Sequence, residues 1–326
     1  MIMKTTCYNR FKASLNCLFI AIGLVLMTAC NKGDDIYNPG DNESGGQGGE
    51  QTEDAQLKLI VSKKGSLLSQ HTWNDGNTLG LFLTEGVLGR PYLGDKENYS
   101  NVKAYMWAGS WLLTPQKVQL TEDEAVIYAY SPYIKNVDPF EVPIETEKNI
   151  DYMVGTHHES QKSVDIYNNT ASLEMQHVLS LIQINVRKNH NFKARALLQE
   201  IALESASDSR KLPVKGTLDI MTAAVTPNGY GSYQIANLNQ VLPDEYRDSC
   251  SYHMMVLPRD NKANEVFLSI TVNGNRMSLP LNDENDWKQG VHNTYNVVFD
   301  GSDMRMDKVE IKPWKEINIE GEIEGR

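Results

Sequence analysis

Residues 266–281 read Val-Phe-Leu-Ser-Ile-Thr-Val-Asn-Gly-Asn-Arg-Met-Ser-Leu-Pro-Leu, and this stretch decides the fold class. Val266–Val272 and Met277–Leu281 are apolar runs of strand length, and Asn273-Gly274 lies between them. Asn-Gly in this position is a strong hairpin signal, because both residues tolerate the positive φ angles of a tight turn. The stretch therefore predicts a β-hairpin.

Similar short apolar runs recur along the rest of the chain, roughly every 8–15 residues, with Pro or Gly at most of the joints. They are Leu57–Val61, Thr78–Leu83, Ala104–Trp107, Val126–Tyr130, Leu173–Met175, Leu181–Val186, Glu200–Leu203, Tyr252–Leu257 and Tyr295–Phe299. Only Phe192–Glu204 has apolar residues at helical spacing, and no second helical segment supports an α/β alternation. The pattern predicts an all-β chain built of sandwiches.

The first 29 residues predict a lipoprotein signal peptide. The run Cys17–Met27 is apolar and follows three basic residues, Lys4, Arg10 and Lys12. A positive flank, a short apolar core and small residues before the cut site mark a secretory signal, and the run is too short to span a bilayer. Leu26-Met-Thr-Ala-Cys30 resembles a bacterial lipobox, in which the cysteine is lipidated and becomes the mature N-terminus. The alternative is an ordinary secretory signal with a chance cysteine.

Cleavage before Cys30 would leave 326 − 29 = 297 residues, enough for roughly two domains. The formal charge would move from −11 to −14, since the signal holds three basic residues and no acidic ones. Such an acidic chain lacks the basic surface that nucleic-acid binding needs. Cys250 would be the only free thiol left, so no intrachain disulfide can form. We expect Cys250 to be an inert strand residue, because few basic neighbours surround it.

Residues 30–54 predict a flexible tether, and the remainder predicts two folded domains. Gly, Asn, Asp and Glu dominate the tether. Its Asp34-Asp35 pair resembles a surface-export signal of some Gram-negative lipoproteins, with ordinary tether charge as the alternative. Residues 155–170 are polar and poor in apolar side chains. We therefore expect a boundary near residue 168, within about ten residues, between an N-terminal sandwich (55–168) and a C-terminal sandwich (169–326).

The sequence carries no recognisable catalytic or cofactor motif. His157-His158-Glu159 is the densest group of metal ligands, but adjacent side chains on a strand point to opposite faces. It also lacks the i, i+4 histidine spacing of helical metal sites, so we expect a solvated loop. His177, among Met175, Val178 and Leu179, is expected to be a packed strand residue. We expect no catalytic residue, no metal and no cofactor.

Trp107 and Trp111 offer a weaker alternative function. They straddle an expected turn, and two exposed indole rings could form a stacking platform for sugars. Tryptophans beside strands are more often packed than exposed.

The C-terminal segment 309–326 predicts a long amphipathic strand with a break at Pro313. Its apolar side chains occupy alternate positions, namely Val309, Ile311, Ile317, Ile319 and Ile323, and the intervening positions are mostly charged. Trp314, Lys315 and Gly321 depart from this alternation. The segment is either the last strand of its own domain or a donor strand that enters a groove of another subunit. An unpartnered strand of this kind would promote aggregation, so both interpretations require a partner strand for it.

Three stretches resemble the fimbrillin-like family, the pilus subunits of anaerobic Gram-negative bacteria from mouth and gut. Asp151–Gly155 is similar to an Asp-Tyr-aliphatic-aromatic-small motif of that family. Leu173–Val186 is similar to its strand pair around a His-Ala-Leu core, and Trp287–Phe299 to the entry of its closing strand. Val154, where an aromatic residue is common, and Val178, in place of alanine, depart from the family pattern.

The resemblance implies two tandem transthyretin-like β-sandwiches and export as a lipoprotein. It also implies that a trypsin-like protease removes the first strand, and that the C-terminal strand of the next subunit fills the groove. Here the removed strand would be Gln56–Ser62, and Lys63-Lys64 is the best basic cut site. Arg90 is a poorer site, because Pro91 follows it. Such head-to-tail contacts do not close, so they build a filament.

The expected function is therefore a non-enzymatic stalk subunit of a cell-surface fimbria. The expected location is the outer membrane, exposed at the surface and anchored through lipid on Cys30, and then the fimbrium. Expected partners are other fimbrial subunits and a host or bacterial surface glycan or protein. Two alternatives remain: an anchor subunit that keeps its lipid, and a monomeric glycan-binding surface lipoprotein.

Overall fold

The structure is a computed structural model that describes residues 56–64, 73–114, 118–155, 163–206, 211–245, 249–262, 264–281 and 286–314. The signal peptide, Cys30 and the tether lie outside these residues, as do His157–Glu159 and the tail from Lys315. Among the described residues, no helix has the length and apolar character to cross a membrane. Nearly all the regular structure is strand, so the all-β prediction is confirmed.

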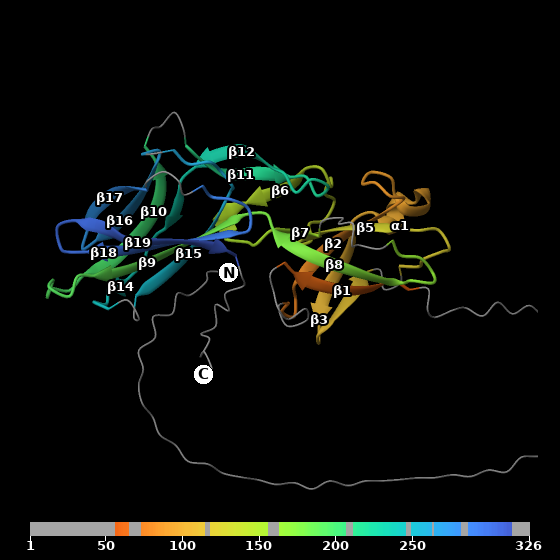
Figure 1. Cartoon of the computed structure of the whole chain (residues 1–326), viewed down its shortest axis with the longest axis horizontal. Helices are drawn as coiled ribbons and strands as arrows, with labels where there is room; N and C mark the ends of the chain where they lie inside the picture. Colours follow the sequence, from red (N-terminus) through yellow and green to blue (C-terminus); the bar gives the residue numbers. More distant parts are fainter. Residues whose placement is uncertain are drawn as a thin grey trace, which may run out of the picture. The chain divides into compact units, whose positions relative to one another are not determined.

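Nineteen strands are assigned within the described ranges (Figure 1). They are β1 (Lys58–Lys63), β2 (Thr78–Thr84), β3 (Val102–Trp107), β4 (Ser110–Thr114), β5 (Val126–Ser131), β6 (Val142–Glu145), β7 (Met153–Gly155), β8 (Thr170–His177), β9 (Ser180–Lys188), β10 (Leu197–Ser205), β11 (Leu212–Leu218), β12 (Val225–Gly231), β13 (Tyr233–Ile235), β14 (Gln240–Val241), β15 (Cys250–Val256), β16 (Val266–Val272), β17 (Asn275–Leu281), β18 (Val291–Phe299) and β19 (Met304–Pro313). One α-helix, α1 (Lys96–Tyr99), and the 3-10 turns Tyr92–Gly94 and Thr146–Lys148 accompany them.

The first strands form a seven-stranded sheet in the order β1-β8-β7-β5-β2-β3-β4. Every neighbouring pair in it is antiparallel except β1 and β8, which run parallel, side by side in Figure 1. Its inward side chains form one apolar core, to which β1 contributes Leu57 and Val61 and β4 contributes Leu113. The two edge strands thus bury side chains in the same core, so the sheet folds over on itself.

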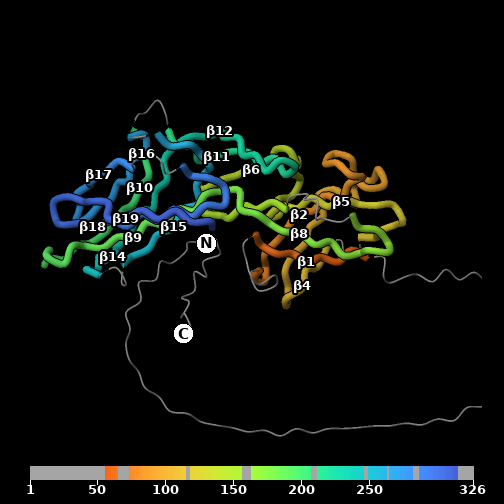
Figure 2. Tube along the Cα trace, viewed as in Figure 1, coloured from red at the N-terminus to blue at the C-terminus, as the bar shows by residue number. Residues whose placement is uncertain are grey.

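A β-sandwich forms from two further sheets. One has the order β15-β9-β18-β19, and the other has β13-β10-β16-β17 with β14 also paired to β10. Their facing sides share a second core, with Ile184 and Tyr295 from the first sheet and Ile201 and Ile270 from the second. The backbone trace in Figure 2 follows these strands in the green and blue part of the chain.

A three-stranded sheet, β12-β11-β6, bears on the predicted domain boundary. β6 precedes residue 168 but pairs with β11, whereas β8 follows it but pairs with β1 and β7 of the seven-stranded sheet. Strands from both sides of residue 168 therefore share a sheet. The division into 55–168 and 169–326 stays a prediction.

The hairpin at residues 266–281 is confirmed. β16 and β17 pair in register around Asn273 and Gly274, whose φ angles are 49° and 80°. The Asn273 side chain fastens the turn to β10, because its Oδ1 accepts from the Leu197 N–H and its Nδ2 donates to the Arg195 carbonyl. The one stretch with helical spacing, Phe192–Glu204, is not a helix, since β10 occupies Leu197–Ser205.

Candidate functional site

β1 is an edge strand held by a single long ladder. It pairs with β8 from Lys58 opposite Thr170 to Lys63 opposite Met175. Just before the strand begins, the Leu57 N–H donates to the Val118 carbonyl at 3.0 Å. Leu57 and Val61 are buried, and Leu59 packs against the same core. β1 is thus an edge strand that closes an apolar core.

A groove of about 310 Å³ lies between β1 and the β3–β4 hairpin. Leu57–Val61 line one side, and Met106 with Gly109–Trp111 lines the other. From Lys58 to Val61, β1 is therefore flanked by β8 on one side and by this groove on the other.

The two lysines of the predicted cut site have different surroundings. Lys63 is partly buried, and its Nζ lies 4.6 Å from the centroid of the Trp73 ring. Burial lowers the pKa of Lys63, while the negative charge of Asp151 acts in the opposite direction. Lys64 is exposed, and its Nζ donates to Gln176 Oε1 at 3.4 Å. Of the two side chains, only Lys64 is open to a protease.

The described part of the predicted donor strand lies in its own sheet. β19 is an edge strand paired with β18, with Val309 opposite Tyr295 and Ile311 opposite Asn293. Val309 packs against the sandwich core, whereas Ile311 is 48% exposed. Ile317, Ile319 and Ile323 lie outside the described residues.

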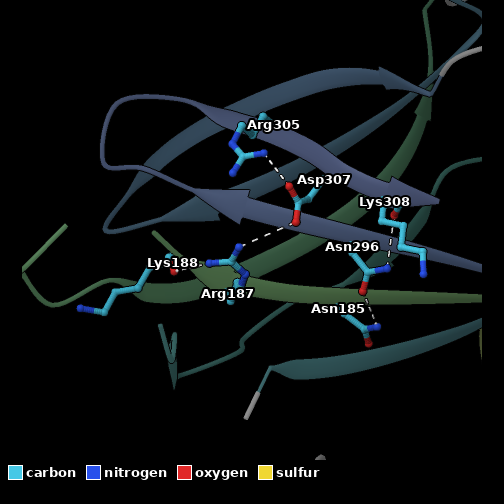
Figure 3. Close-up of polar contacts among 7 residues, drawn as sticks. All are labelled: Asn185, Arg187, Lys188, Asn296, Arg305, Asp307 and Lys308. Carbon is cyan, nitrogen blue, oxygen red and sulfur yellow. Dashed lines mark hydrogen bonds and ion pairs between the residues drawn. The ribbon is translucent and has the colours of Figure 1, made fainter. Parts of the chain in front are cut away.

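A line of polar groups holds the middle of β19 to its sheet (Figure 3). Asn185 on β9 donates to Asn296 on β18 at 2.9 Å, and Asn296 donates to the Lys308 carbonyl on β19 at 3.3 Å. Asp307 pairs with Arg305 at 2.6 Å and faces Arg187 on β9 at 3.8 Å. These contacts reach across three strands, so β19 is part of the sheet rather than a loosely placed end.

The exposed face of β19 carries paired charges. Glu310 accepts from Lys308 at 2.7 Å and from Lys312 at 2.6 Å. These hydrogen bonds lower the pKa of Glu310 to about 2. The ion pairs keep this edge charged and soluble over the physiological pH range, which is how natural edge strands avoid pairing with other sheets.

Immediately after β19, Trp314 joins a buried cluster that unites the three stretches singled out in the sequence. Its ring stacks on His177, with centroids 3.9 Å apart and planes 8° apart. His177 Nδ1 lies 2.9 Å from Asp151 Oδ1, and the backbone N–H of Trp314 donates to the Gly290 carbonyl at 2.8 Å. Gly290 in turn donates to Leu179, two residues beyond His177.

The sequence prediction that His177 is a packed strand residue is confirmed, since it is 6% exposed at the end of β8. Its ring partner was not foreseen. The only sequence signal for Trp314 is that a large aromatic side chain interrupts the apolar–polar alternation of the C-terminal segment.

The two tryptophans of the proposed sugar platform do not come together. Trp107 pairs with Ser110, and Met106 pairs with Trp111, around a turn in which Ala108 and Gly109 have positive φ angles. Cross-strand partners share a face and successive residues alternate, so Trp107 and Trp111 point to opposite faces. Trp107 is 61% exposed, whereas Trp111 packs edge-on against Trp73 with ring centroids 5.2 Å apart.

The remaining sequence candidates are a metal site and the Cys250 thiol. Within the described ranges, no group of three or more His, Cys, Asp or Glu side chains could hold a metal ion. His157–Glu159 lies outside those ranges. Cys250 is buried in β15, as expected of a packed strand residue.

The opposite placement of the two tryptophans predicts opposite effects on stability. Trp111→Ala should lower the free energy of unfolding by about 2–4 kcal/mol, since it removes a half-buried aromatic side chain and its contact with Trp73. Trp107→Ala should change it by less than about 0.5 kcal/mol, because its ring is exposed. Urea denaturation of both variants checks this, and equal losses would contradict the assigned strand register.

Comparison with known proteins gives a family and a fold. A family model described as fimbrillin-like matches residues 68–314, most of the chain. A search of curated proteins returns no match.

Among solved structures, a "putative cell adhesion protein" from Bacteroides ovatus aligns with a TM-score of 0.58 and 16% identity, covering 81% of this chain and 99% of its own. A second putative cell adhesion protein, from Bacteroides uniformis, aligns with a TM-score of 0.58 and 15% identity. The alignment covers 81% of this chain and 100% of the other. A fimbrial protein from Bacteroides vulgatus aligns with a TM-score of 0.54 and 13% identity. The alignment covers 80% of this chain and 99% of the other.

At these identities the structural likeness shows a shared fold. The family model supplies the membership, and it spans all three stretches that carry the sequence resemblance as well as His177 and Trp314. The resemblance is therefore confirmed, and this protein belongs to the fimbrillin-like family.

Proposed function

We propose that this protein is a structural subunit of a cell-surface fimbria that assembles head to tail by strand exchange. In this proposal it is exported as a lipoprotein through Cys30, reaches the outer surface of the outer membrane and loses β1 to a trypsin-like protease. The C-terminal strand of the next subunit then pairs with β8. The observation that carries the proposal is the position of β1, an edge strand that fills an apolar core through one ladder.

The energetics of β1 explain why its removal would call for a replacement. Fully burying a Leu or Val side chain contributes about 1.5–3 kcal/mol, so loss of Leu57 and Val61 alone would cost about 3–6 kcal/mol. The outer backbone groups of β8 would lose their partners as well, and unpaired backbone groups are costly unless water or another strand satisfies them. A processed subunit is therefore a strong acceptor for an amphipathic strand.

The C-terminal segment has the pattern that such an acceptor requires. β1 directs Leu57, Leu59 and Val61 toward the core from alternate positions. Ile317 and Ile319 repeat that alternate spacing, and Ile323 continues it after Gly321. Backbone pairing with β8 would supply affinity, and the alternate apolar side chains would set the register.

The contrast between Lys63 and Lys64 predicts where the precursor is cut. We expect trypsin to cleave the folded precursor after Lys64, because a protease must reach the lysine side chain and Lys63 is packed on Trp73. Lys64→Gln should slow cleavage in this region at least about tenfold, whereas Lys63→Gln should leave it unchanged. Mass analysis of the new N-terminus checks this: Gly65 is expected.

The same analysis on material from the native cell surface separates the two fimbrial roles. A stalk subunit begins near Gly65, and an anchor subunit begins at acylated Cys30. Rapid cleavage after Lys63 in the Lys64→Gln variant would contradict the assigned site.

The donor-strand role predicts that assembly depends on one face of the tail. The double variant Ile317→Asp, Ile319→Asp should abolish polymers of the processed protein. Each substitution would place a charge in the apolar core positions that removal of β1 leaves empty. Glu316→Gln with Glu320→Gln changes the opposite face and serves as the matched control, which should still assemble. Size-exclusion chromatography after trypsin treatment reads out both pairs. Polymers formed equally by both would exclude this tail as the donor.

A further inference from the structure

We infer that Trp314 anchors the base of the C-terminal tail, so that β19 stays in its own sheet and only residues 315–326 act as the donor strand. This inference rests on the proposed function and sharpens it. The alternating apolar pattern lies on both sides of Trp314, with Val309 and Ile311 before it and Ile317, Ile319 and Ile323 after it. The pattern alone cannot say which part is donated.

Apart from its ladder with β18, the end of β19 has few buried side chains to hold it in place. After Val309, which is partly buried, Glu310 is also only partly buried, and Ile311, Lys312 and Pro313 are exposed. Pro313 also lacks the N–H that would extend a ladder. Trp314 is 7% exposed and is thus the only buried side chain between Glu310 and the end of the described chain.

The contacts of Trp314 come from segments that are themselves fixed. Its ring lies flat on His177, at the end of β8, and His177 is held by Asp151 at 2.9 Å. The backbone N–H of Trp314 donates to the Gly290 carbonyl, just before β18 begins. The Trp314 side chain is therefore held by the end of β8 and its backbone by the segment before β18, and together these contacts fix where the tail leaves the subunit.

The tail beyond this anchor is long enough to replace β1 along the whole length of its pairing with β8. Twelve residues, 315–326, follow Trp314. Extended, they span at most about 40 Å at 3.3–3.6 Å per residue, about twice the length of the six-residue β1. β19 therefore need not leave its sheet for the tail to reach along β8 of a neighbouring subunit.

The anchor also selects the register. If β19 came free, Val309 and Ile311 would offer the same alternate spacing as Ile317 and Ile319 and would compete for the groove. If the chain is held at Trp314, Val309 and Ile311 stay in their own sheet. Only the apolar residues after Trp314 are then available to the acceptor.

Hydrogen exchange of the processed protein, residues 65–326, tests the inference when it is measured before and after assembly. In the wild type we expect the amides of 309–314 to be protected in both states, and those of 316–323 to gain protection only in the polymer. In unassembled Trp314→Ala, exchange at 309–314 should rise at least about tenfold. Trp314→Phe, which keeps a stacking ring, should retain most of the protection. Trp107→Ala is the matched control, an exposed tryptophan whose loss should change nothing there.

Two results would overturn the anchor. One is protection at 309–314 that appears only on assembly, which would mean that β19 itself is donated. The other is equal exchange at 309–314 in Trp314→Ala and Trp107→Ala. Failure of the proposed function looks different: the processed wild type would not assemble, or 316–323 would stay unprotected in the polymer. Even then, comparing exchange at 309–314 in unassembled Trp314→Ala and Trp107→Ala still tests whether Trp314 anchors the tail.

Discussion

The backbone of β8 is the constraint on which this account depends. β8 lies between β7 and β1, and in the described part of the chain β1 pairs with its outer edge from Thr170 to Met175. A strand in that position cannot stay open, because unpaired backbone groups and exposed apolar side chains both favour pairing with another chain. The segment that pairs with β8 here also places Leu57 and Val61 in the core. In the proposed strand exchange, this one sheet edge would couple the stability of the subunit to its association with other subunits.

At the other end of the chain, the edge strand β19 is protected from pairing with another sheet by its charged side chains. β19 is also an edge strand, but ion pairs around Glu310 and Asp307 make its free face charged. Trp314, which follows β19 directly, stacks its ring on His177. His177 belongs to β8, and its partner Asp151 also acts on Lys63 at the end of β1. The predicted cut site and the base of the tail thus lie near the same end of β8.

The local features of the fold could be predicted from sequence. Asn273-Gly274 specified its hairpin through the φ angles that these residues tolerate, and most apolar runs of strand length became strands. Pairing between distant segments could not be predicted. The parallel pairs β1–β8 and β9–β18 join residues more than a hundred positions apart, and no local pattern encodes them. β6 and β11 were missed because β6 has only four residues and β11 contains Pro213 and Gly216, which weaken a strand signal. Trp107 and Trp111 were paired by proximity in sequence, although a two-residue turn already sets them on opposite faces.

The most direct test of strand exchange is the structure of the assembled fibre at a resolution that traces side chains. The strand paired with Thr170–His177 should belong to the neighbouring subunit, carry Ile317 and Ile319 in the places of β1 side chains, and follow a Trp314 still stacked on its own His177. A fibre in which each subunit keeps its own Lys58–Lys63 on β8 would contradict the account.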